Sequence, residues 1–273
     1  MNSLNFTKMT AAGNDFIIVD NREGKLESNI APLSKLAKAV CERKRSIGAN
    51  GLLALENSGK ADVAMRIFNP DGGEVTMCGN GSRCMAYYVV QKGLAGNTHS
   101  IETKAGILKA EVEGNDVKIE LTQPMDISCN FSLDLSDCRY KISFVNTGVP
   151  HIVHFVEDLD GIDIKKIGRD MRFHKEFAPD GANVNFVKIT GKCELSIRTY
   201  ERGVEEETLA CGTGAVASSV IASELHAMEP PIKVKTPGGE VLIIRFKKIN
   251  GEYKEVYLEG KVKLVYEGGT NYV

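Results

Sequence analysis

EVTMCGNG, residues 74–81, and ETLACGTG, residues 207–214, share the pattern E-x-x-x-C-G-x-G. In each half of the chain a strand-like segment and a turn come before this pattern, and a stretch with helical spacing follows it. The separation of the two cysteines is close to half of the 273 residues. Because a duplicated domain with pseudo-two-fold symmetry produces such spacing, the sequence predicts two similar domains of mixed strands and helices.

The expected strands and helices follow one another in two similar passes, with no linker or block of charge between them. Apolar residues at helical spacing predict the helices, and short or alternating apolar runs predict the strands. Pro230 and Pro231 are expected to stop the last helix. The predicted helices are 32–45, 79–92, 162–171 and 212–227. The predicted strands are 5–9, 16–19, 62–68, three within 99–123, 141–146, 152–156, 184–189, 194–200, 232–235, 240–246, 255–258 and 261–266.

The composition is that of an ordinary globular protein, with a hydrophobic share of 42%, a charged share of 26% and a formal net charge of -2. This balance gives no reason to expect nucleic acid or an anionic membrane as a partner. The apolar runs are too short to span a bilayer, and the first residues lack the pattern of a secretory signal. We therefore expect a cytoplasmic enzyme or binding protein.

The seven cysteines are an odd number, which argues against a framework of disulfides in a protein without an export signal. Four of them stand in no glycine-rich or charged motif, so small buried side chains are expected there. The sequence has no Cys-x-x-Cys and no His-x-x-x-His pair, so no metal site is expected. These four cysteines are Cys41, Cys129, Cys138 and Cys193.

Cys78 and Cys211 differ from the other cysteines because each directly precedes a predicted helix. The unpaired N–H groups at a helix N-terminus favour a thiolate and can also bind a carboxylate. Glycines beside each cysteine let the backbone approach a ligand without a Cβ in the way. Two such thiols on opposite faces of one carbon could invert its configuration, one removing a proton and the other delivering one.

Two other interpretations of the second pattern remain. Residues 212–217, GTGAVA, fit the relaxed dinucleotide fingerprint G-x-G-x-x-A. That fingerprint follows a strand directly and has an acidic residue about 20 positions later, whereas here the strand is expected to end near Tyr200 and residues 231–235 contain no acid. The other alternative is structural, with two buried cysteines at helix starts in a duplicated core.

The chain resembles the diaminopimelate epimerase family over essentially its whole length. The resemblance implies a mixed α/β (α+β) fold of two pseudo-symmetric domains, each a curved, mostly antiparallel sheet around a central helix, with the active site in the cleft between them. It implies domains of residues 1–122, joined by the final strand 262–273, and 123–261. The motifs that carry it are GNDF (13–16), FNPDGGE (68–74), MCGNGSRC (77–84), TGVPH (147–151), GANVNF (181–186), YERGVEEETLACGTGA (200–215) and PGG (237–239).

The family resemblance also implies the activity, which is the interconversion of LL- and meso-diaminopimelate by two thiols, without pyridoxal phosphate or any other cofactor. Cys78 and Cys211 would be the acid/base pair, with Cys211 taking the proton from the LL isomer. His151 and Glu201 would support catalysis, and Tyr266 would lie at the interface of a homodimer. The residues that would hold the substrate are Asn14, Asn69, Gly79, Asn80, Asn183, Glu201, Arg202, Gly212 and Thr213.

The sequence departs from the family pattern in two places. Val149 stands in TGVPH where many members have asparagine, and the segment around Asn50 and Gly51 lacks the glutamine that some members place near the substrate. Both changes concern how the distal end of the substrate is held. They leave a racemase or epimerase of the same fold, acting on another amino acid, as the nearest alternative.

Overall fold

A computed structural model describes residues 3–136 and 138–271. The chain divides into two compact units. Unit 1 extends to Glu120 and takes up the chain again from Gly260, and unit 2 is Leu121–Glu259. Residues 1–2 and 272–273 of the first expected domain, and residue 137 of the second, lie outside the described residues.

Unit 1 is built on a sheet in which most neighbouring strands are antiparallel. Strands β2–β3 and β4–β6 pair in parallel, whereas β1–β2, β3–β4, β4–β5, β6–β7 and β7–β8 pair antiparallel. The C-terminal part of β17 (Glu252–Asn271) pairs with β1. The elements are β1 (Ser3–Ala11), β2 (Asn14–Asp20), α1 (Lys25–Asn29), α2 (Leu33–Cys41), β3 (Gly51–Glu56), β4 (Val63–Phe68), β5 (Glu74–Val75), α3 (Gly79–Gln91), β6 (Thr98–Thr103), β7 (Gly106–Glu113) and β8 (Asp116–Glu120).

Unit 2 repeats the same series of pairings. Strands β11–β12 and β13–β15 are parallel, and β10–β11, β12–β13, β13–β14, β15–β16 and β16–β17 are antiparallel. The elements are β9 (Met125–Asp134), β10 (Arg139–Asn146), β11 (Pro150–Phe155), α4 (Ile164–Arg172), a 3-10 helix (Lys175–Phe177), β12 (Asn183–Gly191), β13 (Glu194–Glu201), β14 (Glu206–Thr208), α5 (Gly212–His226), β15 (Ile232–Lys235) and β16 (Val241–Ile249).

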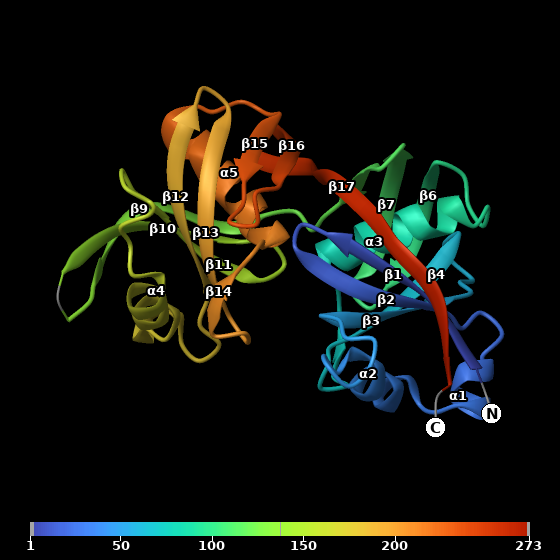
Figure 1. Ribbon diagram of the computed structural model, residues 1–273. Helices are drawn as coiled ribbons and strands as arrows, with labels where there is room; N and C mark the ends of the chain where they lie inside the picture. Colours follow the sequence, from blue (N-terminus) through green and yellow to red (C-terminus); the bar gives the residue numbers. More distant parts are fainter. Residues whose placement is uncertain (1–2, 137, 272–273) are drawn as a thin grey trace. The chain divides into compact units, whose positions relative to one another are not determined.

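Each unit packs its sheet around one buried helix. Helix α3 contacts β1, β2, β7 and β8, and α5 contacts β10, β11, β12 and β16 (Figure 1). A helix that is apolar on every side belongs in a core, and the run from Gly214 to Ala222 in α5 is buried without interruption. The chain thus has a mixed α/β fold in which strands predominate and a central helix begins directly after each cysteine of the two patterns.

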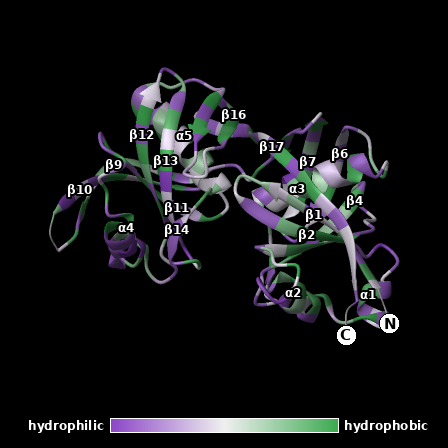
Figure 2. Ribbon diagram, in the orientation of Figure 1, coloured by the Kyte–Doolittle hydropathy of each residue, from purple (hydrophilic) through white to green (hydrophobic). Residues whose placement is uncertain are grey.

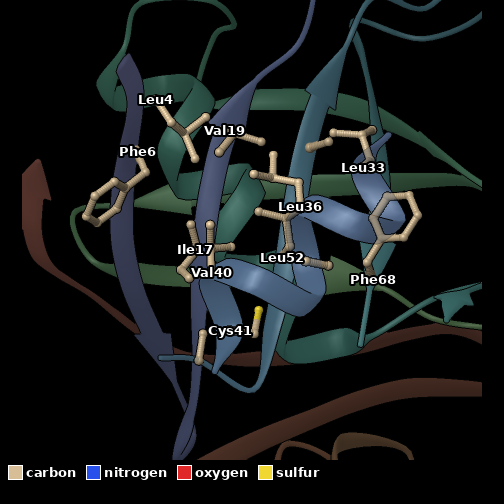
Figure 3. Packing of buried hydrophobic residues seen from close by; sticks show 13 residues of the cluster. Leu4, Phe6, Ile17, Val19, Leu33, Leu36, Val40, Cys41, Leu52 and Phe68 are labelled. Atoms are coloured by element: carbon tan, nitrogen blue, oxygen red, sulfur yellow. The ribbon is translucent and has the colours of Figure 1, made fainter. Parts of the chain in front are cut away.

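A second helix covers the other face of the unit 1 sheet. Leu33, Leu36 and Val40 of α2 lie against Ile17 and Leu52 from the strands, and Figure 3 shows these side chains in one cluster. Full burial of one such side chain contributes roughly 1.5–3 kcal/mol. The helix ends at Cys41 rather than at residue 45 as predicted, because residues 42–45 are all charged and offer nothing to bury.

Helix α4 occupies the matching place in the order of unit 2, and it is largely hydrophilic (Figure 2). Asp163 caps it by accepting a hydrogen bond from the Lys166 N–H at 3.0 Å. Gly168 allows it to approach the sheet, since a Cβ there would lie 2.6 Å from the Tyr200 Cβ. Among the described residues no helix is both long and apolar enough to cross a membrane.

Candidate active site

Cys78 and Cys211 occupy the same position in the two units, the N-cap of the central helix. Both have extended backbone, with φ/ψ of −143°/117° at Cys78 and −125°/110° at Cys211. Each carbonyl accepts the first helical hydrogen bond, from Ser82 at 2.8 Å and from Ala215 at 3.0 Å. Both thiols therefore stand at a helix N-terminus, where unpaired N–H groups favour negative charge.

The two thiols differ in exposure. Cys78 is half-buried, whereas Cys211 is 7% exposed and its Sγ lies 3.4 Å from the Thr213 Oγ1. Gly79, Gly212 and Thr213, the residues that follow the cysteines, are half-buried. The N–H groups of a helix start that is only partly covered can donate to an anionic ligand such as a carboxylate.

Different neighbours limit the space around the second glycine of each pattern. A Cβ on Gly214 would lie 2.3 Å from the Asn185 Oδ1, which is too close for any real contact. A Cβ on Gly81 would meet the Leu53 Cδ2 at 3.1 Å, the end of a side chain that can shift. The requirement for glycine is therefore stricter in unit 2.

A short strand precedes each cysteine, β5 before Cys78 and β14 before Cys211. The strand expected to end near Tyr200 is β13, which ends at Glu201, and the sequence interpretation missed the short β14, which pairs antiparallel with β13. The chain then passes through α5 to β15, which is parallel to β13 and not to β14. A dinucleotide loop joins its helix directly to a strand of the parallel sheet, so β14 does not give residues 212–217 that context.

In unit 1 a chain of amides lies beside the first thiol. Asn80 donates from Nδ2 to the Asn14 Oδ1 at 2.5 Å, and the wholly buried Arg83 donates from Nη2 to the Asn80 Oδ1 at 2.5 Å. The arginine can only donate, so it orients the Asn80 amide, and Asn80 in turn occupies the Asn14 oxygen. The Asn14 nitrogen is then the part of that side chain suited to a ligand acceptor.

Asn69 and Asn50, which the sequence analysis singled out, also belong to unit 1. Asn69 is exposed in the turn between β4 and β5, where its N–H donates to the Gly73 carbonyl at 2.8 Å. Asn50 is held by Asp15, because its Oδ1 accepts from the Asp15 N–H at 3.1 Å and its own N–H donates to the Asp15 Oδ1 at 3.0 Å. Asn50 therefore fixes the residue next to Asn14.

In unit 2 a buried polar cluster lies under the second thiol loop. The Asn185 Nδ2 donates to the His151 Nδ1 at 3.0 Å and to the Ile152 carbonyl at 2.9 Å, and its Oδ1 accepts from the Thr199 Oγ1 at 3.0 Å. Because the His151 Nδ1 accepts, Nε2 carries the ring proton. Burial, and then the charge of Arg202, lower the pKa of His151 to about 3, so its ring is neutral.

The sequence interpretation named His151 but missed Asn185. Its signal was present in GANVNF, where Asn183 and Asn185 alternate along β12 and so share one face of the strand. The His151 Nε2 is buried and has no hydrogen-bond partner within residues 3–136 and 138–271. A buried donor of this kind normally has a partner, so its N–H is available to a ligand or a water.

Glu201 and Arg202, at the end of β13, lie in different environments. Asn183 accepts at Oδ1 from the Arg202 backbone N–H at 2.8 Å and donates from Nδ2 to the Pro150 carbonyl at 3.2 Å. Burial raises the pKa of the Glu201 carboxyl, and the nearby Thr208 side chain opposes this effect. Asn183 thus fixes the backbone that carries Arg202, which is half-buried as a residue.

Val149 and Tyr266 are the last two positions singled out from the sequence. The Thr147 Oγ1 donates to the Thr213 carbonyl at 3.3 Å, so the TGVPH segment with the half-buried Val149 is tied to the start of α5. Tyr266 on β17 is 43% exposed and meets the Phe6 ring edge to face, with 5.8 Å between the ring centroids.

Comparison with known proteins gives close relatives in sequence and more distant ones in structure. The family model described as diaminopimelate epimerase matches residues 6–125 and 143–265. The diaminopimelate epimerase of Aquifex aeolicus is 42% identical and covers 97% of both chains. That of Chlorobaculum tepidum is 40% identical over 95% of this chain and 98% of its own.

Two solved structures share the fold at low identity. A phenazine biosynthesis protein of the PhzF family from Bacillus anthracis has a TM-score of 0.76 at 19% identity, covering 99% of this chain and 100% of its own. A probable proline racemase from Agrobacterium radiobacter has a TM-score of 0.71 at 14% identity, covering 99% and 93%.

Proposed function

Because the chain belongs to the diaminopimelate epimerase family, we propose that Cys78 and Cys211 are the two proton-transfer groups of its epimerase reaction. The chain is an isomerase of lysine biosynthesis that acts on diaminopimelate. The observation that carries the assignment is that Cys78 and Cys211, and no other cysteine of the described residues, stand at the N-cap of the central helix of their unit.

The proposed reaction inverts one α-carbon of the substrate. The Cys211 thiolate removes the α-proton of the LL isomer, and the electron pair of the broken C–H bond stays on the substrate as a carbanion. The Cys78 thiol then donates its proton to the opposite face, which gives the meso isomer. The enzyme ends with a thiol at Cys211 and a thiolate at Cys78, and the reverse reaction restores the first state.

The helix starts have a second part in this proposal. The carbanion spreads its charge into the neighbouring carboxylate, so fixed donors to that carboxylate lower the barrier. The backbone N–H groups of residues 79–80 and 212–213 are suited to this because they lie in the first turns after the cysteines. Asn14 is suited to the same acceptor, since Asn80 leaves only its amide nitrogen to donate.

The other residues are assigned to the remainder of the substrate. Arg202 has the planar fork that binds a distal carboxylate, and Asn183 holds its backbone. Glu201 is assigned to an ammonium group, and Asn69 to the polar groups of the distal end. His151 supports the catalytic pair, and its neutral ring and its unpaired Nε2 within the described residues fit a donor.

The arrangement of the two halves, the oligomeric state and the location are also proposals. We propose two pseudo-symmetric halves, each a curved sheet around its helix, that present both thiols to one substrate in a cleft. The repeated series of strand pairings supports the duplication. We propose a homodimer with Tyr266 at its interface, supported by the exposure of that ring, and a cytoplasmic location.

The test is isotope exchange in heavy water. The metal-free protein, kept under reducing conditions so that its thiols are free, is incubated with LL-diaminopimelate. Deuterium should enter the α-carbon while the meso isomer appears. No exchange and no meso isomer would refute the proposed reaction. Parallel incubations with proline and alanine test the alternative substrate that Val149 suggested, and exchange at either of these in place of diaminopimelate would favour it.

A further inference from the structure

The glutamate that opens each E-x-x-x-C-G-x-G pattern has no part in the reaction proposed above. In both units it is bound by an arginine from the neighbouring strand. The Arg66 Nε donates to the Glu74 Oε1 at 2.9 Å and its Nη2 to Oε2 at 3.3 Å. The Arg198 Nε donates to the Glu207 Oε1 at 2.7 Å and its Nη2 to Oε2 at 2.7 Å. Both pairs are bidentate and use the same atoms.

The two pairs also occupy the same place in the strand ladder. Glu74 stands opposite Phe68, and Glu207 stands opposite Tyr200. In each case the arginine lies two residues before that partner on the same strand, so the pair is diagonal across one face. The cysteine follows four residues after the glutamate in both units.

The strands that carry these glutamates are too short to be held by their backbone ladder alone. Strand β5 has two residues and β14 has three, and each is the last regular structure before its cysteine. A bidentate arginine fixes both the distance and the direction of the carboxylate that it binds. The Arg66 guanidinium is itself placed over the Phe68 ring, 5.0 Å from the centroid.

We propose that Arg66–Glu74 and Arg198–Glu207 are positioning pairs, each of which holds the short strand that aims one catalytic thiol. This inference rests on the proposed function of Cys78 and Cys211. The exposed fractions of the four side chains lie between 23% and 33%, and ion pairs this exposed to solvent contribute little to stability. Their main consequence is therefore geometric, since a displacement of about 1 Å at reacting groups can cost roughly a hundredfold in rate.

The two pairs have different support from other groups. Lys104 also approaches the Glu74 carboxylate, at 3.3 Å, and the Arg66 hydrogen bond lowers the pKa of Glu74. Arg198 also donates from Nη1 to the Leu159 carbonyl at 3.0 Å, so it joins β14 to the loop before α4. Within the described residues, Glu207 is the one carboxylate that forms an ion pair with Arg198, whereas Arg66 also lies 3.6 Å from the carboxylates of Glu27 and Glu56.

The test measures each thiol separately. In Glu74→Gln and Glu207→Gln, the rate of iodoacetamide alkylation at Cys78 and at Cys211 is followed by mass spectrometry, together with kcat, KM and the midpoint of urea unfolding. Glu259→Gln is the matched control, because Glu259 also pairs with an arginine of the neighbouring strand, Arg245, at 3.0 Å.

We expect Glu74→Gln to change the alkylation rate of Cys78 alone and Glu207→Gln that of Cys211 alone, each by about fivefold or more, with kcat lower by about tenfold. KM and the unfolding midpoint should stay close to those of Glu259→Gln. Glu74→Asp and Glu207→Asp, which keep the charge on a shorter stem, should give smaller changes of the same kind and serve if a glutamine variant does not fold.

Equal alkylation rates in all folded variants would overturn the inference, as would changes at both thiols together with a lower unfolding midpoint. Failure of the proposed reaction itself has a different signature. In that case Cys78→Ala and Cys211→Ala would keep epimerase activity, whatever the alkylation rates in the glutamate variants.

Discussion

The loops of Cys78 and Cys211 have the same backbone and different surroundings. Both cysteines cap a buried helix, follow a short strand and precede a glycine at the third position after the cysteine. Behind Cys78 the polar side chains are an amide pair oriented by a buried arginine, whereas behind Cys211 they are a neutral histidine, an amide and a hydroxyl. The repeated backbone thus presents a thiol in each half, and the polar side chains behind that thiol differ between the halves.

This difference suits a reaction in which one carbon is approached from two faces by groups with similar tasks. The carbon has the same carboxylate for both thiols, so the helix starts can be alike. The rest of the substrate is not the same on both sides, so the supporting side chains need not be alike. The following predictions test how far the two halves are equivalent, from the largest effect to the smallest.

Replacing either thiol should have the largest effect. Cys78→Ala and Cys211→Ala should each lower kcat by about a thousandfold or more, because the loss of a proton-transfer group removes one face of the reaction. Conversion of LL- to meso-diaminopimelate, followed by chiral chromatography, measures this. Cys129→Ala is the control, because Cys129 is exposed, contrary to its expected burial. A variant at either position that keeps full activity would show that the halves do not share the task.

A single added methyl group should affect the two halves differently. Gly214→Ala should lower kcat by about a hundredfold and destabilise the protein by about 1–3 kcal/mol, because the new Cβ would overlap the Asn185 oxygen. Gly81→Ala should be close to neutral, since the Leu53 side chain can move and alanine favours a helix. Kinetics and urea unfolding of both variants measure the difference, and equal losses would contradict it.

Removing the supporting amides should also affect the halves unequally. Asn185→Ala leaves the His151, Thr199 and Ile152 groups without that partner, whereas Asn80→Ala leaves only Asn14 and Arg83 without it. Each buried group left unpaired costs about 1–3 kcal/mol, so Asn185→Ala should be the less stable variant. Urea unfolding at neutral pH checks the order, and a more stable Asn185→Ala would refute it.

The smallest expected effect is a pH dependence of stability from His151. Its folded pKa is about 3, below the unfolded value of about 6.5, so the unfolded state binds a proton that the folded state does not as the pH falls. Stability should be fully present above about pH 6.5 and should decrease by about 1.4 kcal/mol per pH unit below it.

The comparison for this pH effect is the wild type against His151→Gln, unfolded in urea at pH 7 and pH 5.5. The variant should lose less stability than the wild type between these pH values, because its side chain does not titrate. An equal loss in both proteins would show that His151 does not contribute. His99 and His154, whose pKa values burial also lowers, remain in both proteins and cancel in the comparison.

The elements around the two cysteines could be predicted from the sequence because their signals are local. The helix expected at 79–92 is α3, Gly79–Gln91, and the strand expected at 62–68 is β4, Val63–Phe68. Other expectations failed where the deciding contact is remote. Strands at 255–258 and 261–266 are one continuous β17, because different partner strands hold its two ends, and β9, which pairs with β10, was missed.

The buried polar groups were the hardest part of the site to predict. Arg83 and Asn185 are wholly buried, yet a charged residue in a helix and an asparagine in a strand are usually found near solvent. Only the partners that a folded chain brings to them make their burial possible. Glu74 and Glu207 were visible as part of the repeated pattern, and their arginines were not.

The sequence by itself determined the repeat, the two helix starts and the place of each thiol, because glycine, turn and helix signals act over a few residues. Only the tertiary structure decided which buried polar groups pair, that β5 and β14 are strands, and that Gly214 admits no Cβ. Those outcomes depend on atoms far apart in the chain, and their free energies arise only when folding removes water from both partners.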